Sequence, residues 1–128
     1  MPSADLQGAT LGQVAIRVHD VGRATAFYRD QLGLPLLFEF TGLAFFRCGD
    51  VRLMLSTAEK PEFDHPASIL YYRVPDVEAS YAELSARGVG FVDTPHVVHR
   101  TPTSELWMAF FRDSEGNHAA LMAEKAAI

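Results

Sequence analysis

Cysteine is almost missing from this sequence of 128 residues, which contains only Cys48. A single cysteine cannot form a disulfide within the chain, so a disulfide-stapled secreted scaffold is excluded. Met1 is not followed by the apolar stretch of a signal peptide, and no apolar run approaches the roughly 20 residues that cross a bilayer. We therefore expect a cytoplasmic protein with no membrane partner.

An excess of positive charge is missing as well. The chain has 11 basic and 16 acidic residues, a formal charge of −5, and no block of one sign. Without a basic stripe, nucleic acid is not an expected partner. A P-loop, a dinucleotide-binding glycine motif and a Ser-His-Asp order are also missing. The composition, 48% apolar and 21% charged, is that of a globular domain with one sizeable core.

An internal duplication organises the sequence. The four residues AFFR at Ala44 return at Ala109, followed each time by a glycine-containing turn and an apolar strand. The segment RVHDV at Arg17 aligns in the same way with RVPDV at Arg73. Repeated segments of this kind indicate two copies of one structural unit. We place the first unit at residues 8–57 and the second at residues 67–124, joined by a proline-containing linker over 57–67.

Each unit is predicted to fold as β-α-β-β-β. Alternating apolar residues predict opening strands at 11–18 and 68–74, and Asp20 and Asp76 are predicted helix N-caps. The two helices are expected to end at Gly33 and Gly88. The first unit then continues with strands at 34–40, 42–48 and 51–56. The second continues with a short strand at 89–92, a loop at 93–104 and a closing hairpin that includes 108–122.

The strand faces predict where each sheet meets its helix. The helix side is predicted to carry Val14, Ile16, Val18, Val51, Leu53, Leu55, Leu70, Tyr72, Val74, Ala119 and Leu121. The opposite faces mix small, polar and aromatic residues, which is unlike a tightly packed core. A concave and mostly apolar surface with a few polar groups is typical of a ligand site.

Two motifs resemble a known family. VAIRVHD, starting at Val14, runs into AFYRDQLGL, starting at Ala26, and FRDSEGN, starting at Phe111, is close to the F-x-D-P-x-G-N turn of that family. On these residues the chain resembles the vicinal oxygen chelate superfamily of glyoxalase I, the bleomycin and fosfomycin resistance proteins and the extradiol dioxygenases. The resemblance covers residues 11–123. It implies an α+β fold in which two tandem β-α-β-β-β modules form a U-shaped cup, and it implies a homodimer.

The resemblance also locates the metal ligands of the family's enzymes. Their positions fall on Gln13 and Ile69 in the first strands and on Met54 and Ala120 in the fourth strands. Only Gln13 can coordinate a divalent ion, and a working site needs at least three converging donors. The prediction is therefore a site without metal or other cofactor. The alternative is a rearranged metal site that uses Gln13, His118 or the histidines His65, His96 and His99 with Glu105.

Two residues are candidates for acid-base chemistry. Imidazole side chains in general exchange protons near neutral pH, which makes His118 a candidate, and the Tyr71 hydroxyl can anchor a carbonyl or carboxylate. The structural alternatives are a solvent-exposed histidine at the rim of the cup and a tyrosine that fills the cup. For Phe45, Phe110, Trp107 and the methionines, ordinary packing is the alternative. The predicted ligand-binding set is Gln13, Ala15, Phe45, Met54, Ile69, Tyr71, Trp107, Phe110, His118, Ala120 and Met122.

Two functions follow from these residues. The first is a protein that binds a small, largely apolar molecule in the cup between its modules, without the usual metal. The second is a metal-dependent enzyme of the superfamily, a lyase, epimerase, dioxygenase or thiol transferase, with a rearranged metal site. The missing carboxylates favour the first.

Overall fold

The computed structural model describes residues 5–57 and 65–126, so residues 58–64 of the expected linker lie outside it. The first module contains β1 (Gln13–Arg17), α1 (Val21–Ala26), a π-helical turn (Phe27–Gln31), β2 (Leu36–Phe40), β3 (Leu43–Cys48) and β4 (Val51–Ser56). Its sheet has the order β1-β4-β3-β2, with β1 parallel to β4 and the other pairs antiparallel.

The second module repeats this arrangement. It contains β5 (Leu70–Arg73), α2 (Val77–Ala86), β6 (Gly90–Phe91), β7 (His96–Arg100), β8 (Ser104–Arg112) and β9 (His118–Ala126). The order β5-β9-β8-β6 matches that of the first sheet, again with a parallel opening pair. The α+β fold of two tandem modules is confirmed, and the two sheets are consistent with the predicted cup. The module limits 8–57 and 67–124 stay predictions.

The prediction of a loop over residues 93–104 is wrong, because part of this segment forms β7. The cause is the length of β8, which begins at Ser104 and so extends well beyond the part that pairs with β6. This extension offers unpaired backbone groups, and His96–Arg100 pairs with it in antiparallel fashion.

The first helix also differs from the prediction. Asp20 caps it as expected, with its Oδ1 accepting from the Arg23 amide at 3.0 Å. After Ala26, however, the α-helix widens into the π-helical turn, in which the Leu32 amide donates to the Phe27 carbonyl at 3.0 Å. The wider turn accommodates two neighbouring buried rings, Phe27 and Tyr28.

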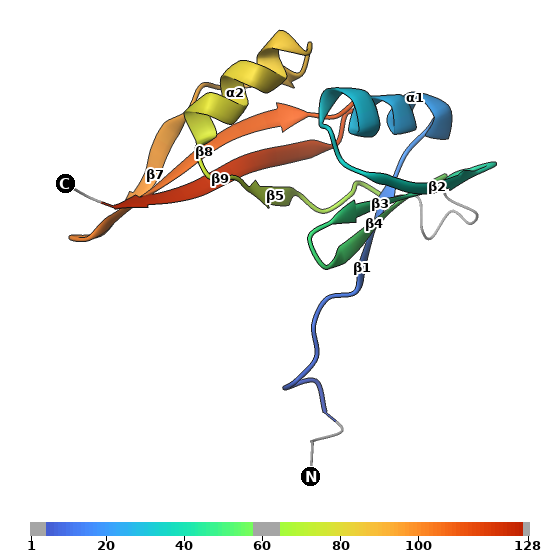
Figure 1. Cartoon of the computed structure of the whole chain (residues 1–128), viewed down its shortest axis with the longest axis horizontal. Coiled ribbons are helices and arrows are strands. Elements are labelled where there is room, and N and C mark those ends of the chain that lie inside the picture. Colours follow the sequence, from blue (N-terminus) through green and yellow to red (C-terminus); the bar gives the residue numbers. More distant parts are fainter. Residues whose placement is uncertain (1–4, 58–64, 127–128) are drawn as a thin grey trace.

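The core lies between the helices and the predicted faces of the sheets. Figure 1 shows α1 and α2 on the same side of the two sheets. The fully buried residues of these strands include Ile16, Leu53, Leu55, Ala119 and Leu121, as their alternation predicts. Among the described residues, no helix is long and apolar enough to cross a membrane. The face of each sheet opposite its helix is called the cup face below.

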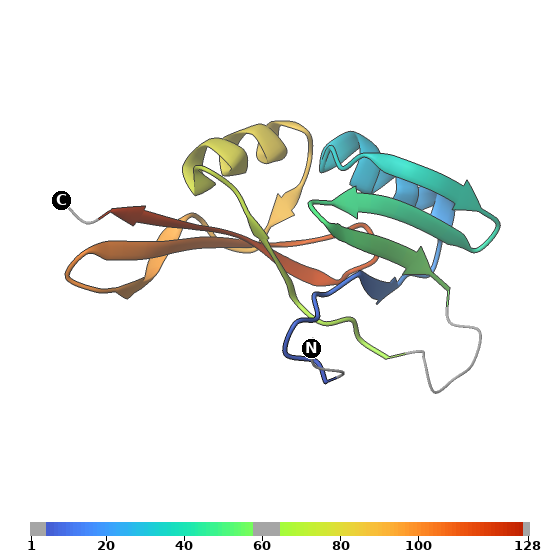
Figure 2. The same cartoon turned by 60° about the horizontal axis from the view of Figure 1, so that its bottom comes forward.

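The turn between β8 and β9 joins the two modules. The carboxylate of Glu115 accepts from the His19 and Asp20 amides at 2.8 and 2.9 Å and pairs with Arg23 at 2.7 Å. Asn117 donates to the Arg17 carbonyl at 3.0 Å. In Figure 2 the end of the β8–β9 hairpin lies beside the first module. The second module therefore completes the start of the first module's helix.

Candidate functional site

On the first module, four predicted or neighbouring cup residues contact one another. The side-chain oxygen Oε1 of Gln13 accepts a hydrogen bond from Arg52 Nε at 2.8 Å, and the side-chain nitrogen Nε2 of Gln13 lies 3.7 Å from Met54 Sδ. The Arg52 guanidinium lies 4.7 Å from the centre of the Phe45 ring. Ala15 pairs with Met54 across β1 and β4. The structure thus brings Gln13, Ala15, Phe45 and Met54 together on one face.

A bulge in β2 adds two aromatic residues that the sequence analysis missed. Leu36 pairs with Phe46, but Phe38 pairs with Phe45, so Leu37 is an extra residue in this edge strand. An extra residue reverses the facing of every side chain after it. Phe38 therefore lies edge-on to Phe45 with 5.3 Å between ring centres, and 5.8 Å from Phe40. The adjacent apolar pair Leu36-Leu37, which breaks the alternation, was the available signal.

A cavity of about 600 Å³ borders this cluster. Its lining combines cup-face residues with residues next to the linker, among them Leu43, Met54, Ser56 and His65. A volume of this size lies within the range of small-molecule sites. His65, an alternative metal ligand in the sequence analysis, is part of this lining.

On the second module, Tyr71 and Phe110 form the centre of the cup face. Their rings meet edge-on with 6.0 Å between centres, and both residues pair with Ala120 across β9. Ile69 and Tyr71 are about half exposed, at 48% and 47%. The strand register places His118 and Met122 on the same face. Ala120 shares this face but is completely buried, so a ligand at the open surface does not touch it.

Trp107 is a correction to the predicted set, because it lies on the opposite face. It pairs with Ala123, next to the buried positions Ala109 and Leu121, and packs against the core. The Lys125 ammonium lies 4.3 Å from the centre of the Trp107 ring, and Lys125 also pairs with Glu78 of α2 at 3.1 Å. Trp107 therefore supports the helix side of the sheet and does not line the cup.

A bulge in β7 also changes which face of the sheet its second histidine, His99, lies on. His96 pairs with Met108 and His99 with Leu106, because Val98 is an extra residue. The two imidazoles consequently share the cup face, whereas regular alternation would place residues three apart on opposite faces. Glu105 lies on the other face, where it pairs with Arg100 at 2.9 Å. The alternative metal set is therefore not assembled in the part of the chain that the structure describes.

The family's usual metal positions do not fit an ion in this chain. The Gln13 side chain is engaged by Arg52 and Met54, and thioether and alkyl groups occupy the other three positions. Within residues 5–57 and 65–126, no three or more His, Cys, Asp or Glu side chains form a group that could hold a metal. No catalytic step through a metal can be derived from these residues.

The paired β-α-β-β-β modules and their cup faces define the architecture of the vicinal oxygen chelate proteins. Known proteins agree with this assignment. The model of the Glyoxalase/Bleomycin resistance protein/Dioxygenase superfamily matches residues 10–121, and the chain belongs to this superfamily.

Several relatives cover most of the chain. An uncharacterized protein of Bacillus subtilis (strain 168), YraH, is 29% identical in an alignment of 119 residues that covers 82% of this chain and 91% of YraH. TnmS3, an antibiotic binding protein from Streptomyces sp. CB03234, is 27% identical, with a TM-score of 0.70 and coverage of 88% of this chain and 93% of its own. Lactoylglutathione lyase from Agrobacterium tumefaciens is 26% identical, with a TM-score of 0.68 and coverage of 89% and 92%.

Proposed function

We propose that this protein binds a small, largely apolar molecule on its cup faces without a metal ion. The proposal depends on which residues occupy the four positions where the family's enzymes bind their metal ion. Gln13 is engaged by its neighbours, and Met54, Ile69 and Ala120 offer no oxygen or nitrogen donor. Binding that needs no Lewis acid requires only a matched apolar surface and a few polar groups.

The side chains of the cup faces favour an aromatic ligand. Phe38, Phe40 and Phe45 form a connected cluster on the first module, and Tyr71 with Phe110 forms a second on the other module. Aromatic rings gain most from offset or edge-on contacts with other rings. Met54 and Met122 add adaptable side chains, and His118 and Tyr71 supply hydrogen bonds. The likeness to an antibiotic binding protein supports the binding of a small molecule.

A homodimer is part of this proposal. Phe38, Phe40, Ile69 and Tyr71 are between 46% and 59% exposed, which is unusual for large apolar residues gathered on two sheet faces. A second copy of the chain that covers these faces encloses the ligand between modules. The expected cytoplasmic location is supported by the single cysteine.

The test combines metal analysis with ligand binding. Protein purified without a chelator or a histidine tag is expected to contain no stoichiometric divalent metal. A panel of neutral aromatic compounds is expected to include members that raise its melting temperature, by several degrees at a hundredfold excess over the dissociation constant. Tyr71→Phe and Phe45→Ala are expected to reduce this rise, and Leu6→Ala, which alters an exposed residue before β1, serves as control.

The second candidate function is a metal-dependent enzyme with a rearranged site. The likeness to a lactoylglutathione lyase and the shared facing of His96 and His99 favour it. Titration with Ni, Zn, Fe and Mn separates the two functions. One tightly held ion per chain, lost in a His96→Ala/His99→Ala variant, would replace the binding function with the enzymatic one.

A further inference from the structure

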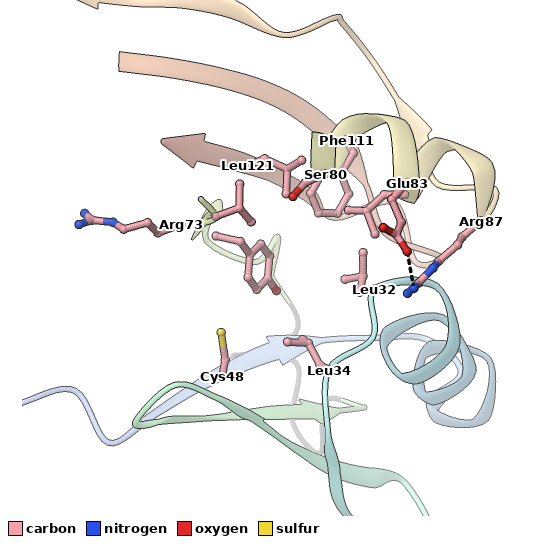
Figure 3. Close-up of a pocket in the computed structure, with 12 residues that line it drawn as sticks. Leu32, Leu34, Cys48, Arg73, Ser80, Glu83, Arg87, Phe111 and Leu121 are labelled. Carbon is pink, nitrogen blue, oxygen red and sulfur yellow. Dashed lines mark hydrogen bonds and ion pairs between the residues drawn. The ribbon is translucent and has the colours of Figure 1, made fainter. Parts of the chain in front are cut away.

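A second cavity lies between the modules on the side of the helices. Its volume is about 400 Å³, and both modules contribute to its lining. Figure 3 shows Leu32, Leu34 and Cys48 of the first module on one side, and Phe111 and Leu121 with the α2 residues on the other. The π-helical turn ends directly before Leu32, so this irregular helix end forms one wall.

This cavity is separate from the cup. Successive side chains of a strand point to opposite faces, so Tyr71 belongs to the cup face of β5 while Tyr72 lines the cavity. Phe111 and Leu121 likewise lie on the helix side of β8 and β9, opposite Phe110 and Ala120. A ligand in one site does not touch the lining of the other.

A buried hydroxyl without a partner marks the cavity as a binding site. The Tyr72 oxygen is buried and has no hydrogen-bond partner among residues 5–57 and 65–126. Its ring lies against Phe111, with 6.3 Å between ring centres and an interplanar angle of 27°. Burial raises the pKa of this hydroxyl, so it remains a protonated donor. Nearly all buried polar groups in proteins are paired, and an oxygen atom of a bound molecule can pair with a donor that lines a cavity.

The charges at the rim indicate that the occupant is neutral. Glu83 and Arg87, one helical turn apart on α2, pair with each other at 2.9 Å and cancel in charge. Arg73 points away from the other labelled residues in Figure 3. The remaining lining is mostly leucine, valine and aromatic side chains.

We propose that this inter-module cavity is a second binding site, for a small neutral aromatic molecule whose carbonyl or hydroxyl oxygen accepts a hydrogen bond from Tyr72. The aromatic ring lies against Phe111 and the leucines that close the cavity from the first module. Because the site is formed by both modules, its occupant also holds them together.

Cys48 provides a direct readout, since it lines this cavity and is the only cysteine of the chain. The rate of its alkylation by iodoacetamide is measured with and without naphthol, a neutral aromatic with one hydroxyl. Naphthalene, which lacks the oxygen, is the matched comparison. Saturating naphthol is expected to slow alkylation at least tenfold. The concentration that gives half of the maximal protection is expected to be about fivefold higher for naphthalene than for naphthol, because naphthalene cannot accept the hydrogen bond from Tyr72.

Three variants decide the location of the bound naphthol. Tyr72→Phe is expected to remove the preference for naphthol over naphthalene, and Ser80→Trp, which fills the cavity from α2, is expected to abolish protection by both. Tyr71→Phe, one residue away on the cup face, is expected to leave protection unchanged. The proposal is overturned if naphthol does not protect Cys48, if Ser80→Trp is still protected, or if Tyr71→Phe loses the protection that Tyr72→Phe retains. A failure of the cup to bind ligand leaves these measurements unaffected.

Discussion

At the scale of single residues, Glu115 is a buried carboxyl with several hydrogen-bond partners. Its side chain has no exposed surface, which alone raises the pKa of a carboxyl. Hydrogen bonds from Arg23, the Asp20 and His19 amides and Ser114 outweigh this burial and lower the pKa of Glu115 to about 2. The carboxylate form is therefore stabilised by folding, and by partners that belong mostly to the other module.

The lowered pKa of Glu115 predicts that the free energy of unfolding depends on pH. Its pKa is lower in the folded chain than in the unfolded chain, where it is near 4.5, so its stabilisation is present above pH 4.5 and is lost as the pH falls toward 2. The expected contribution is about 3 kcal/mol, from a fall in pKa of about 2.5 at 1.36 kcal/mol per pKa unit. Glu115→Gln is expected to lower the free energy of unfolding by a similar amount at pH 7. Urea denaturation at several pH values measures both effects, and parallel pH profiles for the two proteins would contradict the prediction.

Tyr28 predicts a second effect at this scale. Its hydroxyl donates to Asp113 Oδ2 at 2.6 Å inside the core, and the Asn117 amide group donates to the same oxygen at 3.0 Å. Tyr28→Phe removes one of these bonds, so we expect a loss of about 1 to 2 kcal/mol in the free energy of unfolding. Tyr71→Phe on the exposed cup face is the matched control, with an expected change below about 0.5 kcal/mol. Equal losses in the two variants would show that the buried bond contributes nothing.

Residue placement could be predicted from the sequence where a local rule applies. Asp20 and Asp76 both accept from amides of the first helical turn, as their positions before an apolar helix indicate. Trp107 lies on the helix side of the sheet and not on the predicted cup face. It differs in parity from Phe110 within β8, so the sequence did contain the signal for the helix side.

At the scale of elements, two of the edge strands, β2 and β7, change the surface of the cup faces. β2 and β7 each contain one extra residue, Leu37 and Val98, and each change of facing moves aromatic or imidazole groups onto the cup face. Period-two alternation predicted the faces of β1, β4, β5 and β9. It could not predict β2 and β7, because a bulge is defined by the partner strand and by backbone pairing that the alternation does not describe.

Removing the bulge tests its role. Deletion of Leu37 removes the extra residue but keeps the pairs of Leu36 with Phe46 and of Phe38 with Phe45, so Phe38 and Phe40 are expected to stay on the cup face. We expect the free energy of unfolding to change by less than about 1 kcal/mol and the rise in melting temperature with cup ligands to be retained. Phe40→Ala, which truncates a side chain that is 59% exposed, is expected to change stability by less than about 0.5 kcal/mol. A deletion variant that loses the ligand response would mean that the facing of Phe38 depends on the bulged backbone itself.

At the scale of the whole molecule, the exposed cup faces predict self-association. The chain mass is 14.1 kDa, and sedimentation at micromolar concentration is expected to give twice this value. Ile69→Lys places a charge on one of the exposed apolar residues and is expected to shift the mass to that of one chain. Leu6→Lys, at a residue 84% exposed before β1, is the control. A monomer in the unchanged protein would contradict a cup shared between two copies.

The duplication in the sequence was sufficient to predict the β-α-β-β-β order along the chain in both modules, apart from the additional strand β7, because each copy repeats the same local patterns. It was not sufficient to predict the inter-module cavity. That cavity depends on how the π-helical turn and α2 lie against each other, for example through Gln31, which donates to the Arg87 carbonyl at 3.0 Å. Such contacts between distant segments leave no periodic trace in the sequence.

The turn at residues 113–117 has a consequence for the order in which the protein is made. A ribosome synthesises the first module long before this turn, yet Arg23 and the amides of His19 and Asp20 bond to Glu115, and Tyr28 bonds to Asp113. Domains generally fold as they emerge. Here the nascent first module lacks the carboxylates of Asp113 and Glu115 until the turn at residues 113–117 has been made, so its final packing follows the synthesis of most of the second module.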